Sequence, residues 1–299
     1  MSAFLQFLVN GLTVGSFYAL VALGYTMIYG IIRLINFAHG DIFMVGAFVG
    51  WTVLAALAAS HLPALAALGV ALVVAMAATG ALGLVIERVA YQPLLKAPRL
   101  SILITALGAS LALENGVMLK YGAGFETYPH LLAGAGFSVL GAQVKYAQVG
   151  FFLLSLALMA GLYLFVHRTP VGTAMRALAL DQDAARLMGV NVEGVIMLTF
   201  FLGSALAAAA GVMYGTYYTQ INFMMGFLLG LRAFTAAVLG GIGNIPGAMV
   251  GGLLIGLLEA FSSGYISGQW KDVIVFAVLI LVLVVKPTGL FGERVVERM

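Results

Sequence analysis

The chain has 299 residues, of which 63% are apolar and only 8% are charged, against roughly 25% charged residues in a typical soluble domain. So few charges could not cover the surface of a soluble protein of this length, which excludes a soluble globular fold. The absence of cysteine excludes disulfides, thiolate metal sites and cysteine nucleophiles. The net charge of +3 comes from basic residues spread between apolar runs, where they set membrane orientation rather than bind nucleic acid.

Eight apolar segments follow one another, and several reach the roughly 20 residues needed to cross the hydrocarbon core of a bilayer. They cover about 5–30, 41–59, 63–86, 100–119, 148–166, 194–219, 231–260 and 272–288. The runs are continuously apolar rather than alternating, which favours helices over a β-barrel. We therefore predict an all-α polytopic membrane protein with a single transmembrane domain over residues 1–299. No basic region precedes the first run, so we expect this run to be retained as a span.

Lysine and arginine gather in three places, and they set the predicted orientation. The connections 87–99 and 167–193 and the C-terminus are basic, so the positive-inside rule puts them in the cytoplasm. The long glycine-rich loop 120–147 is then the candidate for the outside. Counting crossings toward the C-terminus leaves a parity conflict, which disappears if the broken segment 231–260 dips in and returns to the same side. A similar re-entrant path for 31–59 would put the N-terminus inside.

Two polar, glycine-containing breaks interrupt the apolar pattern. Residues 34–41 read LINFAHGD and residues 240–247 read GGIGNIPG, and an apolar helix with early glycines follows each. Paired broken helices are typical of transporters with a midplane pathway, although chance explains so short a similarity equally well. The predicted pathway or helix-break residues are Asn36, His39, Gly40, Gly240, Gly241, Gly243, Asn244, Pro246 and Gly247.

The residues at the two breaks also have structural interpretations. Glycines recur every four residues from Gly243 and again at Gly252 and Gly256, and we favour tight helix packing there over a hinge or gate. For His39 we favour a hydrogen-bonded structural histidine over a proton relay or a metal ligand, because the four histidines form no ligand pair. No metal site is therefore predicted. The sequence also contains no phosphate loop and no nucleophile elbow, so neither ATP binding of the P-loop kind nor catalysis is predicted.

The polar stretch 168–193 stands apart from the rest of the chain. Pro170 and Gly172 mark its start and Gly189 and Asn191 its end, so its middle reads as one short helix with a glycine near its C-terminus. Alanine, leucine and methionine give this helix an apolar side. Two interpretations stay open at this point: a solvated connector between two spans, and a docking helix that enters a groove of a soluble partner.

Taken together, these stretches resemble the permease subunits of high-affinity branched-chain amino acid ABC importers of the LivH type. The matching stretches, in order, are 10–47, IERVAYQPLL at 86–95, RALALDQDAARLMGVN at 176–191, 234–260 and KPTGLFG at 286–292. The resemblance implies a multi-pass protein of the bacterial cytoplasmic (inner) membrane, surrounded by lipid, beside a second homologous permease subunit. It also implies two ATPase subunits, which bind ATP and Mg, and an extracytoplasmic substrate-binding protein. The chain itself would bind no cofactor.

The same resemblance implies a role for the polar stretch. Residues 177–190 look like the family's coupling helix, within a cytoplasmic coupling loop at 167–193 that docks on an ATPase. The implied coupling residues are Ala177, Asp181, Asp183, Ala184, Ala185, Leu187, Met188 and Gly189.

Other functions stay open beside the importer. An ion-coupled secondary transporter of small polar solutes would need midplane carboxylates, for which Glu114, Glu259 and Asp41 are the candidates. We do not expect Glu114 or Glu259 to couple protons. Urea and short-amide ABC importers use close relatives of this permease, so urea and short amides are alternative substrates. A membrane scaffold without transport is the third alternative.

Overall fold

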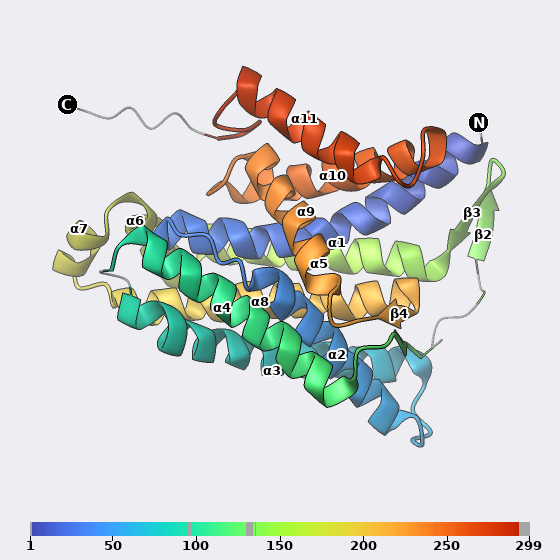
Figure 1. Cartoon of the computed structure of the whole chain (residues 1–299), viewed down its shortest axis with the longest axis horizontal. Coiled ribbons are helices and arrows are strands. Elements are labelled where there is room, and N and C mark those ends of the chain that lie inside the picture. The colour runs from blue at the N-terminus through green and yellow to red at the C-terminus, as the bar shows by residue number, and fades with distance from the viewer. Residues whose placement is uncertain (1, 95–96, 130–133, 135, 293–299) are drawn as a thin grey trace.

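The computed structural model describes residues 2–94, 97–129, 134 and 136–292, and it is mostly helical (Figure 1). The α-helices are α1 (Ser2–Ile32), α2 (His39–Leu57), α3 (Ala64–Ile86), α4 (Arg99–Tyr121), α5 (Tyr146–Arg168), α6 (Pro170–Leu180), α7 (Gln182–Leu187), α8 (Val192–Tyr218), α9 (Met225–Gly240), α10 (Ile245–Tyr265) and α11 (Lys271–Val285). The strands are β1 (Glu126–Thr127), β2 (Gly136–Val139), β3 (Ala142–Lys145) and β4 (Gln220–Ile221). Within these residues, seven helices are long and apolar enough to cross a membrane. The predicted polytopic helical fold is confirmed.

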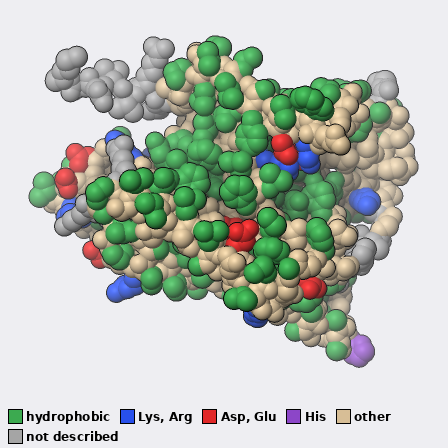
Figure 2. All heavy atoms as spheres, viewed as in Figure 1, with side chains coloured by type: hydrophobic (Ala, Val, Ile, Leu, Met, Phe, Trp, Pro, Cys, Tyr) green, Lys and Arg blue, Asp and Glu red, His purple; other side chains and the backbone are tan. Residues whose placement is uncertain are grey.

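The helices α1 and α8 form the centre of the bundle. In their most apolar windows 72% and 78% of the residues are buried, against 22% for α4 and 28% for α5. The peripheral helices expose large apolar side chains such as Val73, Ile104 and Leu153. Figure 2 shows apolar side chains over most of one face, interrupted by small groups of charges. Because lipid chains are as apolar as a protein interior, a peripheral membrane helix needs no polar outer side.

The two ends of the bundle differ in what they carry. One end, which we call the α7 end, carries α6, α7 and the chain after α11; the other, the hairpin end, carries β2 and β3 (Figure 1). The N-terminal turns of α1 lie at the hairpin end, where the Gln6 side-chain oxygen accepts a 2.8 Å hydrogen bond from the backbone N–H of Gln143. The expected N-terminus on the same side as the basic connections is therefore wrong. The helix α1 crosses the whole bundle from the hairpin end to the α7 end. The helix α2 then runs to the hairpin end, so segment 31–59 does not return to the side from which it started.

The predicted segment 231–260 folds as two helices, α9 and α10, separated by a break at 241–244. Gly247 of α10 lies against Gly240 of α9, and Gly251 lies against Ala236. These contacts make α9 and α10 an antiparallel pair, so the chain reaches the α7 end and returns toward the hairpin end. The segment thus starts and ends at the same end of the bundle, which removes the parity conflict.

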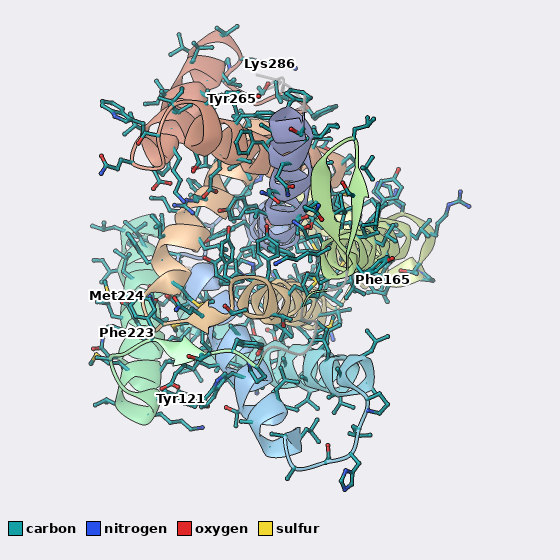
Figure 3. The ribbon with its side chains drawn as sticks, turned by 90° about the vertical axis from the view of Figure 1, so that its right-hand side faces the viewer. Tyr121, Phe165, Phe223, Met224, Tyr265 and Lys286 are labelled. Atoms are coloured by element: carbon teal, nitrogen blue, oxygen red, sulfur yellow. The ribbon has the colours of Figure 1, made fainter. Side chains whose placement is uncertain are left out.

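Short strand pairs organise the hairpin end, which Figure 3 views directly. β2 and β3 pair from Gly136↔Lys145 to Val139↔Ala142, and the two turn residues Leu140 and Gly141 both have positive φ, at 49° and 85°. Two-residue turns of this kind match the twist of the strands they join. β1 pairs with β4, so the loop after α4 is held against the chain between α8 and α9. In Figure 3, Phe223 and Met224 lie in this connection, at the edge of the bundle.

A glycine seam joins α1 to α10. Gly256 lies against Gly11 and Gly15, and Gly252 lies against Ala19, so the two helix backbones are in contact. Small residues allow this approach because no side chain stands between the helices. The predicted packing role of the glycine ladder is confirmed along this seam.

We expect Gly256→Val to disrupt the packing of α1 against α10. A β-carbon at position 256 would meet the backbone of Gly11 and Gly15, which cannot move aside as a flexible side chain could. Overpacking of this kind costs about 1–3 kcal/mol, which should appear as a lower melting temperature and a smaller monodisperse fraction in mild detergent. Gly161→Val in α5 is the matched control, because no heavy atom lies within 4 Å of the added carbon. Equal melting temperatures for the two variants would contradict the seam.

Candidate coupling and translocation sites

The polar stretch folds as two helices, so the expected single helix is wrong. Thr169 caps α6 by accepting a 3.0 Å hydrogen bond from the N–H of Gly172. At Asp181 the backbone turns extended, with φ −153° and ψ 113°, and its carboxylate accepts from the N–H groups of Asp183 and Ala184 at 2.9 and 3.0 Å. Aspartate is a favoured N-cap because it satisfies N–H groups that lack a partner in the first turn. Asp181 thus ends α6 and starts α7.

The end of α7 has the geometry expected of Gly189. Its φ is +85°, in the left-handed region that favours glycine. The N–H of Gly189 donates to the carbonyl of Arg186 at 3.0 Å, and the N–H of Val190 donates to that of Ala185 at 3.1 Å. These two bonds form a Schellman motif, which satisfies carbonyls left free at a helix end.

Apolar side chains in this stretch lie on two sides. Leu178 and Ala185 are buried in the bundle, whereas Leu180, Leu187 and Met188 point away from it with 83%, 89% and 84% of their surface exposed. The predicted single apolar face is therefore divided between internal packing and an outward tip. Of the other predicted coupling residues, Ala177 is half-buried on α6, and Asp181, Asp183, Ala184 and Gly189 are exposed.

A direct hydrogen bond links α7 to the core helix α1. The side-chain amide of Gln182 donates to the backbone carbonyl of Ile31 at 2.8 Å. Ile31 lies in the last turn of α1, immediately before the first break. A movement of α7 would therefore act on the end of α1 through this one side chain.

If the chain is the transporter subunit that the resemblance implies, we expect Gly189→Val to lower substrate uptake by the assembled transporter while leaving its amount in the membrane unchanged. A left-handed conformation costs an L-residue about 1–2 kcal/mol, and a β-branched side chain tolerates it least. The end of α7 should therefore unwind and shift the exposed tip. Gly189→Asn is the control, because asparagine also occupies this position in natural helix ends. Equal uptake by the valine variant and the wild type would show that the helix end has no part in transport.

The first break, residues 33–38, leads the chain back into the bundle. Asn36 is held there by a 2.8 Å hydrogen bond that the Tyr91 hydroxyl donates to its side-chain oxygen. His39 is fully buried beside Gly24 and Gly203, but among the described residues neither of its ring nitrogens has a hydrogen-bond partner. The backbone of Val21 is the nearest hydrogen-bonding group to the ring, so the interpretation of His39 as a structural histidine stays a prediction. The described residues also contain no group of three His, Asp or Glu side chains that could hold a metal ion.

The second break, residues 241–244, lies at the α7 end. Gly241 and Gly243 have positive φ, at 109° and 92°. Asn244 caps α10 by accepting from the N–H of Gly247 at 2.8 Å and donates to the carbonyl of Phe291 at 3.1 Å, and Pro246 stands in the first turn. The N–H of Phe291 also donates to the carbonyl of Gly240 at 2.9 Å.

The two breaks lie at different depths, so they are not equivalent halves of one midplane site. The first brings His39 beside Gly24, well inside α1, whereas at the second Gly243 lies against Gly30, near the end of α1. Beside the second break, the chain after α11 satisfies the carbonyls of Leu239 and Gly240 at the end of α9. Of the predicted pathway residues, Gly40 makes the other central contact, against Gly226 and Gly230 of α9.

A buried charge cluster lies between α1, α9, α10 and α11, and sequence reasoning missed its central residue. Arg232 is 7% exposed and donates to Glu259 and to the Tyr18 hydroxyl at 3.1 Å each. It also forms a two-pronged pair with Asp272, at 2.8 and 3.1 Å. Lys271 reaches Glu259 at 2.8 Å, and the Tyr18 hydroxyl donates to the same carboxylate. The available signal was an arginine inside an apolar run, which is rare and usually paired.

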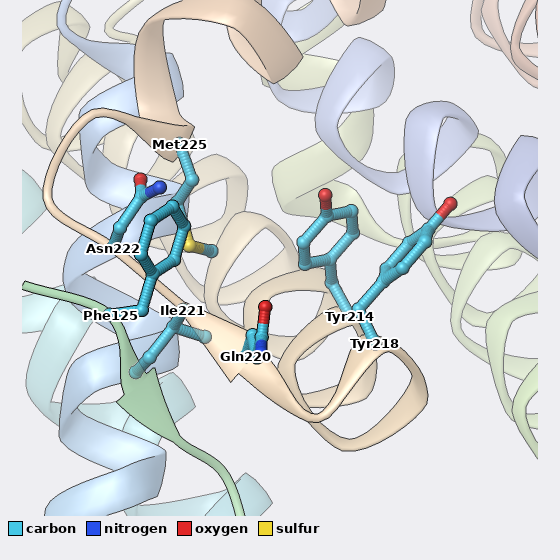
Figure 4. A pocket seen from close by; sticks show the side chains of 7 residues that line it. All are labelled: Phe125, Tyr214, Tyr218, Gln220, Ile221, Asn222 and Met225. Carbon is cyan, nitrogen blue, oxygen red and sulfur yellow. The ribbon is translucent and has the colours of Figure 1, made fainter. Parts of the chain in front are cut away.

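A cavity of about 180 Å³ opens near the hairpin end (Figure 4). Its lining is Phe125, Tyr214, Tyr218, Gln220, Ile221, Asn222 and Met225. These residues come from the loop after α4, the end of α8, β4 and the first turn of α9, which the β1–β4 pairing brings together. Apolar and aromatic walls with a few polar groups are typical of small-molecule sites.

Comparison with known proteins identifies the family. The family model for the branched-chain amino acid transport system permease component matches residues 7–283. The chain belongs to this family. It is 48% identical to the high-affinity branched-chain amino acid transport system permease protein BraD of Pseudomonas aeruginosa, over 99% of this chain and 98% of that one. It is 46% identical to LivH, the corresponding permease protein of Escherichia coli, over 99% and 97%.

A solved structure shares the fold of this family member. It is a metal-chelate type ABC transporter in an inward-facing conformation, with a TM-score of 0.54 and 18% identity, covering 94% of this chain and 87% of that one. At this identity the likeness concerns the fold alone. Together with the seven membrane-length helices, family membership makes the chain a multi-pass inner-membrane permease subunit, a transport component rather than an enzyme.

Proposed function

We propose that this permease subunit carries branched-chain amino acids across the inner membrane as part of an ATP-driven ABC importer. The observation that carries the proposal is the near full-length similarity to BraD and LivH, two permeases named for this substrate class. Its proposed partners are a second homologous permease, two ATPase subunits that hold ATP and Mg, and an extracytoplasmic substrate-binding protein. Urea and short amides are the alternative cargo.

In this proposal the α7 end faces the cytoplasm and α7 docks on an ATPase subunit. The exposed Leu187 and Met188 suit an apolar groove, and Asp183 and Arg186 stand beside them as polar contacts. The bond from Gln182 to Ile31 offers a route from the docked helix to α1. A partner that holds α7 differently with and without ATP would shift the permease between its two states, because only differential contacts move such an equilibrium.

The ion-coupled alternative has less support. Its candidate Glu259 is paired with Arg232 and Lys271 at 3.1 and 2.8 Å, so its charge is already balanced. Glu114 is half-buried on α4. Neither arrangement favours a carboxylate that must gain and lose a proton in each cycle. The third candidate, Asp41, is buried and accepts a hydrogen bond from Ser110, and an ion-coupled route would have to depend on it alone.

A pull-down from mild detergent tests the proposal. Wild-type chain should co-purify with an ATPase and a second permease, and a variant with residues 181–188 scrambled should lose the ATPase and keep the permease. Proteoliposomes holding the wild-type complex and its binding protein should then take up leucine, isoleucine and valine only when ATP is supplied. Uptake of urea or amides instead would replace the substrate class, and uptake driven by an ion gradient by the purified chain alone would overturn the importer assignment.

A further inference from the structure

We propose that the start of α9, with Asp41 beside it and the cavity of Figure 4 next to it, is a transient binding site for a zwitterionic amino acid with an apolar side chain. The inference rests on the proposed function and names the place where the permease itself holds the cargo. The cavity takes the side chain, the first turn of α9 takes the carboxylate, and Asp41 takes the ammonium group.

The cavity suits an aliphatic side chain. Phe125, Ile221 and Met225 form apolar walls, and Figure 4 shows the rings of Tyr214 and Tyr218 on the other side of the opening. At about 180 Å³ the cavity is smaller than the range of roughly 300–1,000 Å³ that drug-sized ligands occupy. A single amino acid side chain is a ligand of suitable size.

The carboxylate site is the first turn of α9. This helix has 16 residues and no side-chain cap within its first turn. Asn222 accepts hydrogen bonds from the N–H groups of Met224 and Met225 at 3.1 and 3.3 Å, so the carboxylate would meet the N–H groups that follow. The first N–H groups of a helix lack partners within it and carry a partial positive charge, so they attract a carboxylate. Met225 belongs both to this turn and to the cavity wall. Transporters with interrupted helices commonly present such half-helix N-termini to anionic groups of the substrate.

Asp41 supplies an independent observation at the same turn. It is 1% exposed, and Ser110 donates a hydrogen bond to one of its carboxylate oxygens. Among the described residues, the other oxygen has no partner. That oxygen is directed at the start of α9, since a β-carbon built on Gly226 would lie 2.6 Å from it. A buried carboxylate oxygen without a partner is costly, and an ammonium group would satisfy it.

The arrangement also explains why glycine stands on both sides of this crossing. Gly40, next to Asp41, packs against Gly230 of α9, where a β-carbon would lie 2.8 Å from the Gly230 Cα. The contact is between backbones, so a small separation of α2 from α9 would open the space around Asp41. An opposite pair of charges beside an apolar cavity matches an α-amino acid more closely than a neutral amide or a simple cation.

The test uses the complete importer in nanodiscs without its binding protein, with tritiated L-leucine as the probe. Wild type should bind leucine, and both 3-methylbutylamine and 4-methylpentanoate, which lack the carboxylate and the ammonium group respectively, should compete. Asp41→Asn, which keeps the shape of the side chain, should weaken leucine binding about tenfold to hundredfold. It should also abolish competition by the amine and spare competition by the acid. Glu87→Gln is the matched control and should bind as wild type does, because Glu87 is another buried carboxylate that has an oxygen without a partner among the described residues.

A second variant addresses the cavity. Met225→Trp should fill the space and weaken leucine binding, while competition by glycine, which has no side chain, should change little. If wild type imports leucine with ATP but binds none in nanodiscs, or if Asp41→Asn and Met225→Trp both bind leucine as wild type does, the site is wrong and the importer function stands. If wild type with its binding protein imports no branched-chain amino acid, the proposed function fails and the site fails with it.

Discussion

The double change Leu187→Asp with Met188→Asp is expected to abolish ATP-driven uptake while the permease still folds. Both side chains are more than four-fifths exposed, so neither supports the core of this chain. In the proposed docking they enter a groove of the ATPase, where an apolar anchor contributes about 2 kcal/mol or more. Each lost anchor corresponds to about a thirtyfold weaker complex. Uptake into proteoliposomes and ATPase co-purification should therefore both fall below detection.

Leu62→Asp is the control for this double change. Leu62 is also an exposed apolar residue, 46% accessible, but it lies in the loop between α2 and α3, away from α7. Its variant should transport normally and co-purify with the ATPase. If the double variant at the tip of α7 transports as well as this control, α7 is a solvated connector and the coupling assignment is wrong.

Arg232→Ala is expected to destabilise the permease more than any other single change considered. The substitution leaves Glu259 buried with Lys271 as its remaining cationic partner. It also removes the ion pair through which Asp272 of α11 binds α9. Breaking a buried ion pair by removing one partner typically costs about 3–5 kcal/mol. The melting temperature in detergent and the yield of monodisperse protein should both drop sharply.

A rescue variant separates charge imbalance from lost packing. Arg232→Met combined with Glu259→Met removes the buried pair and keeps much of its volume, and such replacements are often close to neutral. Lys271 and Asp272 are about one-third exposed, so they can turn toward water and toward each other. The double variant should recover most of the stability that Arg232→Ala loses. If the single variant melts like wild type, the cluster does not hold α11 to the bundle.

Several features followed from local sequence alone. Gly189 was expected at a helix end because glycine adopts left-handed geometry, and its φ is +85°. The glycines every four residues in α10 were expected to admit a neighbouring backbone, and α1 lies there. Both are short-range properties of the chain that do not depend on how the remote helices pack.

Features that depend on contacts between distant residues could not be predicted from the local sequence. The alanines and leucines around Asp181 favour one continuous helix, whereas aspartate itself favours an N-cap, and the structure uses it to divide the polar stretch into α6 and α7. The two breaks look alike in sequence, yet one turns inward and the other is sealed by Phe291. The N-terminus would lie beside the basic connections only if 31–59 were re-entrant, and the local pattern could not show that α1 and α2 run to opposite ends of the bundle.

The sequence by itself determined the class of molecule, because 8% charged residues and long apolar runs leave a helical membrane protein as the stable solution, and its ordered motifs determined the family. Tertiary structure alone decided which polar groups meet. Tyr18 and Glu259 are 241 positions apart, and Arg232 lies on a third helix. The charges of Arg232 and Glu259 are tolerable in the membrane only because packing brings these two side chains into contact. Asp41 and Gly226 likewise become neighbours only where α2 crosses α9. Pairing energy depends on distance in space, and nothing in the local pattern of either segment encodes that distance.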